Sequence, residues 1–197
     1  MRFIAISASL LIAVGMVAAS SIAQLKSDIQ AIDSGVVNLY QHCQTEQLSL
    51  FSALAIKTAA DDLTTKINAG SKDAQALNEK LGDADAKSLI KTLADTETRV
   101  KITTGLMAKL KPQFDKLRTT ALALSTINQL QEEVKDFGER LISICPQSTR
   151  SAAKQLSEKY NTDLANCAEA YQNTSSESEK GDMGSQSSQN AQVENST

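Results

Sequence analysis

Apolar residues recur every three or four positions along most of the chain, which is the period of an α-helix that buries one face. No stretch between residues 25 and 171 alternates apolar and polar residues for long enough to predict a strand. Gly70 is expected to end the second helix, which is followed by a short helix from Lys72, and Pro112 is expected to separate the next two. The pattern predicts an all-α fold, an antiparallel bundle of about five main helices.

The two ends of the chain differ from this helical stretch. Residues 1–23 hold an apolar run with Arg2 as its one charge, followed by small residues, which predicts a cleaved signal peptide and a secreted protein. Residues 173–197 are rich in Ser, Gln and Asn and predict a disordered tail, which leaves 24–172 as the bundle domain. Asn173 and Asn195 begin N-x-Ser/Thr motifs and are candidate glycosylation sites.

Three cysteines enter an oxidising compartment if the chain is secreted. Cys43 and Cys167 each lie 18 residues past the start of a predicted helix, Leu25 and Thr149, and these two helices run in the same direction. Cys145 ends an oppositely directed helix. We therefore predict a Cys43–Cys167 disulfide worth about 4 to 5 kcal/mol in the chain-entropy estimate, with Cys145 free.

Charge and motifs exclude several classes of function. The chain has 20 basic and 23 acidic residues without a basic cluster, so nucleic acid is not an expected partner. The single histidine, His42, has no recognisable nucleophile motif to serve, and its more ordinary role is an exposed helical residue. No Cys/His spacing predicts a metal site, and no glycine-rich loop predicts a phosphate or cofactor site. The residues predict neither a catalytic centre nor a cofactor.

Small and polar residues interrupt the apolar stripes of the predicted helices. Such a bundle either packs closely at its centre or leaves a channel that an acyl chain fills, with hydroxyl groups near its head group. The pattern alone favours close packing, because protein interiors rarely leave voids. If a channel exists, its candidate lining residues are Phe51, Ala55, Ala59, Leu93, Thr96, Val100, Thr103, Ala121 and Leu124.

The order of the helical segments resembles a known family. Its best-matching parts are Asp28-Ile29-x-x-Ile32-Asp33, Leu54-x-Ile56 and Lys111-x-x-Phe114, set within about residues 25–172. Together they resemble the fungal hydrophobic surface-binding protein A family, which includes cell wall galactomannoproteins.

The resemblance implies an extracellular or cell wall protein rather than an enzyme. Its implied partners are a fatty acid or other apolar ligand, hydrophobic surfaces and cell wall polymers. One function it implies is a lipid module that holds a fatty acid in the bundle core. The alternative is a structural wall mannoprotein, or an adsorbed scaffold that recruits secreted hydrolases without lipid cargo.

Overall fold

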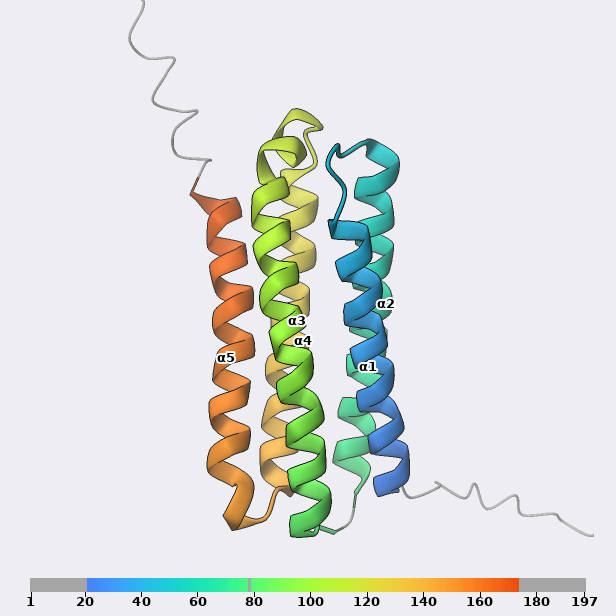
Figure 1. The fold of residues 1–197 in the computed structure, drawn as a ribbon, viewed down its shortest axis with the longest axis vertical. Coiled ribbons are helices and arrows are strands. Elements are labelled where there is room, and N and C mark those ends of the chain that lie inside the picture. Colours follow the sequence, from blue (N-terminus) through green and yellow to red (C-terminus); the bar gives the residue numbers. More distant parts are fainter. Residues whose placement is uncertain (1–20, 78, 174–197) are drawn as a thin grey trace, which may run out of the picture.

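Five long helices make up the part of the chain that the computed structural model describes, residues 21–77 and 79–173. They are α1 (Ile22–Cys43), α2 (Leu50–Ala76), α3 (Asp83–Lys116), α4 (Thr120–Ile144) and α5 (Gln147–Gln172) (Figure 1). The all-α prediction is confirmed, and α1, α3 and α5 run in the same direction as expected. Within the described ranges no helix has the length and apolar character to span a membrane. Residues 1–20 of the predicted signal peptide, residues 174–197 of the predicted tail and Asn195 lie outside the described residues.

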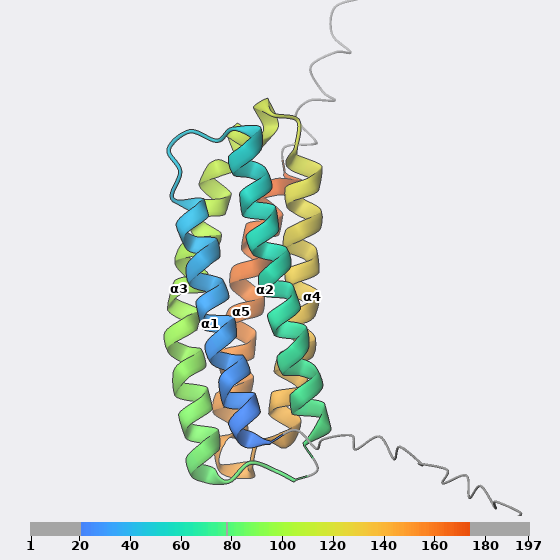
Figure 2. The same cartoon turned by 90° about the vertical axis from the view of Figure 1, so that its right-hand side faces the viewer.

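The five helices form a closed ring in which each packs mainly on two neighbours. The order around the ring is α1, α2, α4, α5, α3 and back to α1. Helices that follow one another along the chain point in opposite directions, and the ring order places α2 beside α4, α5 beside α3 and α3 beside α1, so these three neighbouring pairs are parallel. Figure 2 shows α2 and α4 side by side with their N-terminal ends at the same end of the bundle. The bundle is therefore antiparallel along the chain but only partly so in space.

A ring of five has a wide centre. Packed helices lie about 8–10 Å apart, which places each of five axes about 7 to 8.5 Å from the middle of the ring. The buried core therefore depends on long side chains reaching inward, and small ones leave space there. This geometry raises the question of what fills the centre.

Two predicted helix boundaries are wrong, the first at Gly70. The helix α2 continues through this glycine to Ala76, so the short helix predicted from Lys72 is its last part. A Cβ atom at Gly70 would lie 3.2 Å from Cε2 of Phe137 and 3.4 Å from Cδ1 of Ile32. The glycine thus allows α1, α2 and α4 to approach closely and does not serve as a left-handed helix end.

The second wrong boundary is at Pro112, which lies inside α3. Proline removes one helical hydrogen bond, yet α3 continues to Lys116 and the chain turns only at Arg118, whose φ is 57°. The extra turn buries Phe114, whose ring packs edge-on against Tyr171 at a centroid distance of 5.9 Å. Burial of this aromatic pair offsets the lost hydrogen bond.

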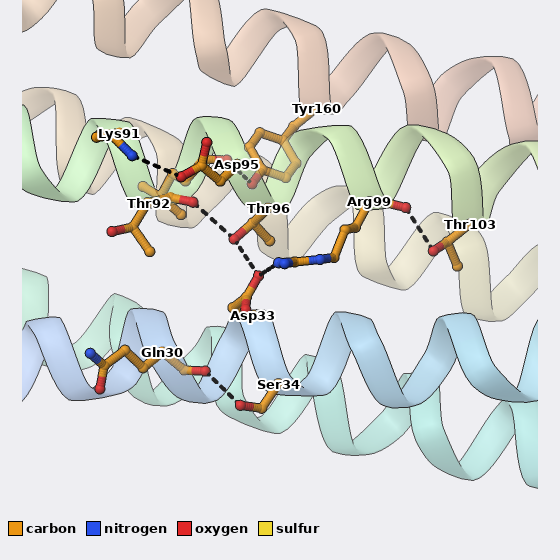
Figure 3. A network of polar contacts seen from close by, with 11 residues as sticks. Gln30, Asp33, Ser34, Lys91, Thr92, Asp95, Thr96, Arg99, Thr103 and Tyr160 are labelled. Carbon is orange, nitrogen blue, oxygen red and sulfur yellow. Dashed lines mark hydrogen bonds and ion pairs between the residues drawn. The ribbon is translucent and has the colours of Figure 1, made fainter.

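Hydrogen bonds join the three parallel helices α1, α3 and α5 along one side of the bundle. The hydroxyl of Thr96 in α3 donates to Oδ1 of Asp33 in α1 at 2.8 Å, and Arg99 forms an ion pair with the same carboxylate (Figure 3). From α5, the hydroxyls of Tyr160 and Tyr171 each donate at 2.7 Å to backbone carbonyls of α3, those of Leu93 and Met107. This side of the ring is therefore held by polar contacts as well as packing.

Asp28 is a buried carboxyl group at the α1–α2 contact. Burial raises its pKa above the ordinary value of 3.8, and a hydrogen bond and negative charge from Asp73 raise it further, although a hydrogen bond from Gln24 acts in the opposite direction. The α3–α5 contact contains a similar group, since burial and Glu97 raise the pKa of Asp163. Each contact therefore holds a carboxyl group whose pKa is raised by the fold.

The cysteines are three free, buried thiols in the structure. The predicted Cys43–Cys167 disulfide is not formed, although the two residues lie at the same end of the bundle, as their spacing predicts. Burial raises the pKa of the Cys43 thiol and of the Cys167 thiol to about 12, and for Cys43 the charge of Cys167 contributes. Cys145 follows the last residue of α4 at the opposite end. The bridge remains a prediction, and the raised pKa values bear on how it would form.

Substitution of Asp28 tests the acid at the α1–α2 contact. Asp28→Asn is expected to stabilise the protein near pH 7, with the gain disappearing as the pH falls to about 4. The pKa of Asp28 is higher in the folded protein than in the unfolded chain, where it is near 3.8. The stability that Asp28 contributes is therefore fully present below pH 3.8 and is lost as the pH rises through the pKa of the folded state. Urea unfolding at the two pH values measures this.

Asp115→Asn is the control, because its effect on the free energy of unfolding is expected to have the opposite sign near pH 7. Hydrogen bonds from Lys111 and Thr120 lower the pKa of Asp115, so its contribution is present at neutral pH and lost in acid. A gain from Asp28→Asn that is the same at both pH values would contradict the assignment.

Oxidative refolding tests the predicted disulfide. We propose that Cys43 and Cys167 form a disulfide by exchange with oxidised glutathione, with release of two molecules of reduced glutathione. Because the thiolate is the attacking species and both pKa values are about 12, the reaction is expected during folding and to be slow in the folded protein near pH 7. Peptide mapping of refolded protein is expected to give the Cys43–Cys167 peptide, unchanged in Cys145→Ser. A bridge that contains Cys145 would contradict the prediction.

Candidate functional site

An apolar cavity of about 300 Å³ occupies the centre of the helix ring. All five helices contribute to its wall, and nearly all the lining side chains are apolar. On α4 the lining runs from Leu122 to Leu141, which corresponds to about 28 Å at the helical rise. The cavity is therefore long and narrow and follows the axis of the bundle.

Small residues create much of this space. Alanines from four helices lie in the cavity wall, where a larger apolar residue would reach further toward the centre. They are Ala53, Ala60, Ala86, Ala123 and Ala153, and all five are buried. The wide centre of a five-helix ring thus stays partly unfilled by the chain's own side chains.

Polar groups in the wall are few, and most hydroxyls are already engaged. Thr103, Thr104 and Thr126 donate to backbone carbonyls of their own helices at 2.8 to 3.0 Å. Tyr160 donates to α3, and burial raises the pKa of its hydroxyl. Among the described residues that line the cavity, Lys57 of α2 is the charged one.

The cavity reaches the surface between the N-terminal ends of α2 and α4. Leu50 and Leu54 of α2 and Leu122 of α4 line it, yet their exposed fractions are 61%, 59% and 45%. Figure 2 shows that these two ends lie next to each other. We call this apolar opening, formed by Leu50, Leu54 and Leu122, the mouth of the cavity.

Three of the nine predicted lining residues line the cavity: Leu93, Val100 and Thr103, all on α3. The predicted stripe on α3 therefore faces the cavity at these three positions. The sequence pattern alone favours close packing at the centre, and the cavity shows that this expectation is wrong.

The predicted lining residues on α2 are wrong. Phe51 is 87% exposed, Ala55 is only partly buried outside the cavity, and Ala59 is buried but does not line it. The first half of α2 carries two overlapping apolar stripes, and the buried one contains Ala53, Ile56 and Ala60. Periodicity alone does not decide between stripes that are both apolar.

The remaining three predictions also fail. Thr96 is fully buried but turns toward Asp33 of α1, as Figure 3 shows, and does not line the cavity. Ala121 is exposed, and Leu124 packs beside the core without lining the cavity. The helix α4 begins at Thr120, seven residues after the predicted start at Gln113, so its inward face carries Ala123 and Thr126.

The structure also shows where the candidate histidine lies, and it places the glycosylation candidate at the end of α5. His42 is exposed in the last turn of α1. Within residues 21–77 and 79–173, no group of three or more His, Cys, Asp or Glu side chains is placed to hold a metal ion. Asn173 is exposed at the C-terminal end of α5, and its use as a glycan acceptor stays a prediction.

Lys57 lines the cavity but is not among the residues predicted to do so. A lysine followed four residues later by an aspartate has the appearance of an ordinary surface pair. The available signal was its spacing from Leu50 and Leu54, which places all three on one face of α2.

Solved structures with the same fold hold fatty acids. The first ligand-binding domain of the Penicillium marneffei MP1 protein, complexed with arachidonic acids, has a TM-score of 0.71 and 14% identity over 77% of this chain and 99% of that domain. AFMP4P in complex with palmitic acid has a TM-score of 0.73 and 22% identity over 77% of this chain and 99% of that one. Identities this low establish a shared fold and no more.

The family comparison is more direct. No curated protein sequence matches the chain. The sequence pattern of the family hydrophobic surface binding protein A matches residues 22–143, which is more than half of the chain. The protein belongs to the hydrophobic surface binding protein A family.

Proposed function

We propose that this protein binds a fatty acid, with the hydrocarbon chain in the central cavity. The observation that carries the proposal is the cavity itself, about 300 Å³ in volume and walled by apolar side chains from all five helices. Ligand pockets begin at about this volume. Binding without catalysis agrees with the exposed position of His42 at the end of α1.

The energetics of packing support an apolar ligand. Apolar wall atoms that face unfilled space lose packing contacts. A hydrocarbon chain that fills the space recovers these contacts and gains about 0.8 kcal/mol for each methylene removed from water. The long, narrow shape of the cavity suits a single chain better than a broad fused-ring lipid.

The structural neighbours support the same proposal, since two of them were solved with arachidonic acids and palmitic acid. The site of action rests on the predicted signal peptide of residues 1–23. We place the protein outside the cell or in the cell wall on that basis.

A second function, adsorption to hydrophobic surfaces, is favoured by the apolar side chains around the mouth. Phe51 is 87% exposed beside Leu50 and Leu54 at the start of α2. Contact of this group with an apolar solid or wall component removes it from water without requiring the bundle to open. A scaffold of this kind would act at the surface with or without lipid cargo.

Filling the cavity tests the first function. Ala123→Leu places a larger side chain in the wall and displaces about two methylenes of ligand, so fatty acid affinity is expected to fall about tenfold. Displacement of a fluorescent fatty acid by palmitate measures the affinity. Ala121→Leu, the same substitution on the exposed side of α4, is the control and should leave affinity unchanged. Equal effects of the two substitutions would contradict binding in the cavity.

Removing the exposed aromatic residue tests the second function. Phe51→Ser is expected to lower partitioning onto octyl-coated beads at least tenfold, because burial of such a side chain contributes about 1.5–3 kcal/mol. Ile102→Ser, at a site on α3 that is 49% exposed and away from the mouth, is the control. Unchanged adsorption of Phe51→Ser would show that this patch is not the contact surface.

A further inference from the structure

We propose that Lys57 binds the carboxylate of the ligand at the mouth of the cavity, so that the acid lies with its head group outward and its chain along the bundle axis. This inference rests on the proposed fatty acid function and deepens it. It assigns the residue that distinguishes an acid from a neutral lipid of the same length, and it fixes the direction in which the ligand lies.

The position of Lys57 supports this assignment. It lies three residues after Leu54 and seven after Leu50, so the three side chains share one face of α2. All three line the cavity, and Leu50 and Leu54 are exposed at its mouth. The side chain of Lys57 is 33% exposed. An amphipathic lysine in this position packs its methylenes against the apolar wall and keeps its ammonium group near water.

The ammonium group of Lys57 has donors to spare. Its Nζ donates to Oδ2 of Asp61 at 2.5 Å, an ion pair within one helix whose aspartate side chain is 47% exposed. An ammonium group carries three N–H donors, so it can hold Asp61 and a ligand carboxylate together. Asp61 does not line the cavity, and its negative charge opposes binding of an acid. Removal of that charge should therefore strengthen binding.

Three hydroxyl groups of the cavity wall suit a carboxylate less well than Lys57, because each already donates to a backbone carbonyl. The hydroxyl hydrogens of Thr104 and Thr126 are directed to backbone carbonyls of their own helices, and that of Tyr160 is directed to the carbonyl of Leu93. A carboxylate needs donors, and burial away from them carries a large cost. Lys57 meets this need at the end of the cavity that water reaches.

Helix direction adds a second electrostatic contribution at the same place. Because α2 and α4 are parallel neighbours, both N-terminal ends lie beside the mouth (Figure 2). Leu50 is the first residue of α2, and Leu122 lies in the first turn of α4. Helix N-termini carry partial positive charge. The two N-terminal ends that flank the mouth therefore add positive partial charge there, although the C-terminal ends of α1, α3 and α5 at the same end of the bundle oppose it. The far end of the cavity, at Leu141 and Cys145, is apolar.

Paired ligands that differ only in the head group test the proposal. Palmitate and hexadecanol displace fluorescent cis-parinaric acid from the full chain and from Lys57→Met, which keeps the length of the side chain and removes its charge. Palmitate affinity is expected to fall about tenfold, the size of one lost charge-assisted hydrogen bond, and hexadecanol affinity to stay unchanged. Lys57→Arg should restore most of the palmitate affinity, and Asp61→Asn should increase it.

Lys66 provides a matched control on the same helix. It forms the same kind of ion pair with Asp62, with side-chain exposures of 29% and 47%, but it does not line the cavity. Lys66→Met should change neither ligand's affinity, and circular dichroism should show that each variant is folded.

The possible outcomes separate the inference from the proposed function. If Lys57→Met weakens palmitate and hexadecanol equally, or if Lys66→Met has the same effect on palmitate, Lys57 is not the head-group residue although the cavity binds lipid. If the unsubstituted protein binds neither ligand, the proposed function fails and this assignment fails with it.

Discussion

The packing of five helices in a closed ring is the constraint on which the other features of this structure depend. Each helix contacts two main neighbours, and the centre is wider than side chains fill when alanines face it. The order of the helices around the ring also makes three neighbouring pairs run parallel. The cavity and the shared location of the α2 and α4 N-termini therefore have the same geometric origin.

The ring is not uniform around its circumference. On one side, Asp33, Thr96 and Arg99 connect α1 to α3, and two tyrosines from α5 donate to the backbone of α3. At the α2–α4 side the cavity reaches the surface between exposed leucines. Polar contacts have directional geometry and resist displacement, whereas apolar contacts are interchangeable with a ligand chain. A fixed wall opposite an apolar mouth is an arrangement suited to taking up a chain without unfolding.

The shape and the polarity of the cavity determine which ligand it can bind. The nearly apolar wall favours a hydrocarbon ligand, and the narrow cross-section of the cavity favours a single chain. The lysine at the mouth favours a ligand with an anionic head group. The exposed Phe51 next to this mouth links the two functions proposed for the protein. An apolar surface that carries lipid is also one to which Phe51 and the leucines of the mouth are expected to adsorb.

Much of this was determined by the sequence alone. The 3.6-residue period predicts the all-α fold, helix order predicts that α1, α3 and α5 are parallel, and spacing brings Cys43 and Cys167 to the same end. The stripe on α3 also assigns Leu93, Val100 and Thr103 to the cavity. These features are local in sequence or follow from counting residues along helices.

Only the tertiary structure decided the rest. Gly70 and Pro112 are ordinary helix-ending signals, but they lie within helices because Gly70 allows close packing against Phe137 and the turn after Pro112 buries Phe114. On α2, two apolar stripes compete, and contacts with α1 and α4 select the one that contains Ala53 and Ala60. Burial energy acts between helices that are distant in sequence. A local pattern therefore does not determine which apolar face of α2 is buried, or that Lys57 lies at the mouth of the cavity.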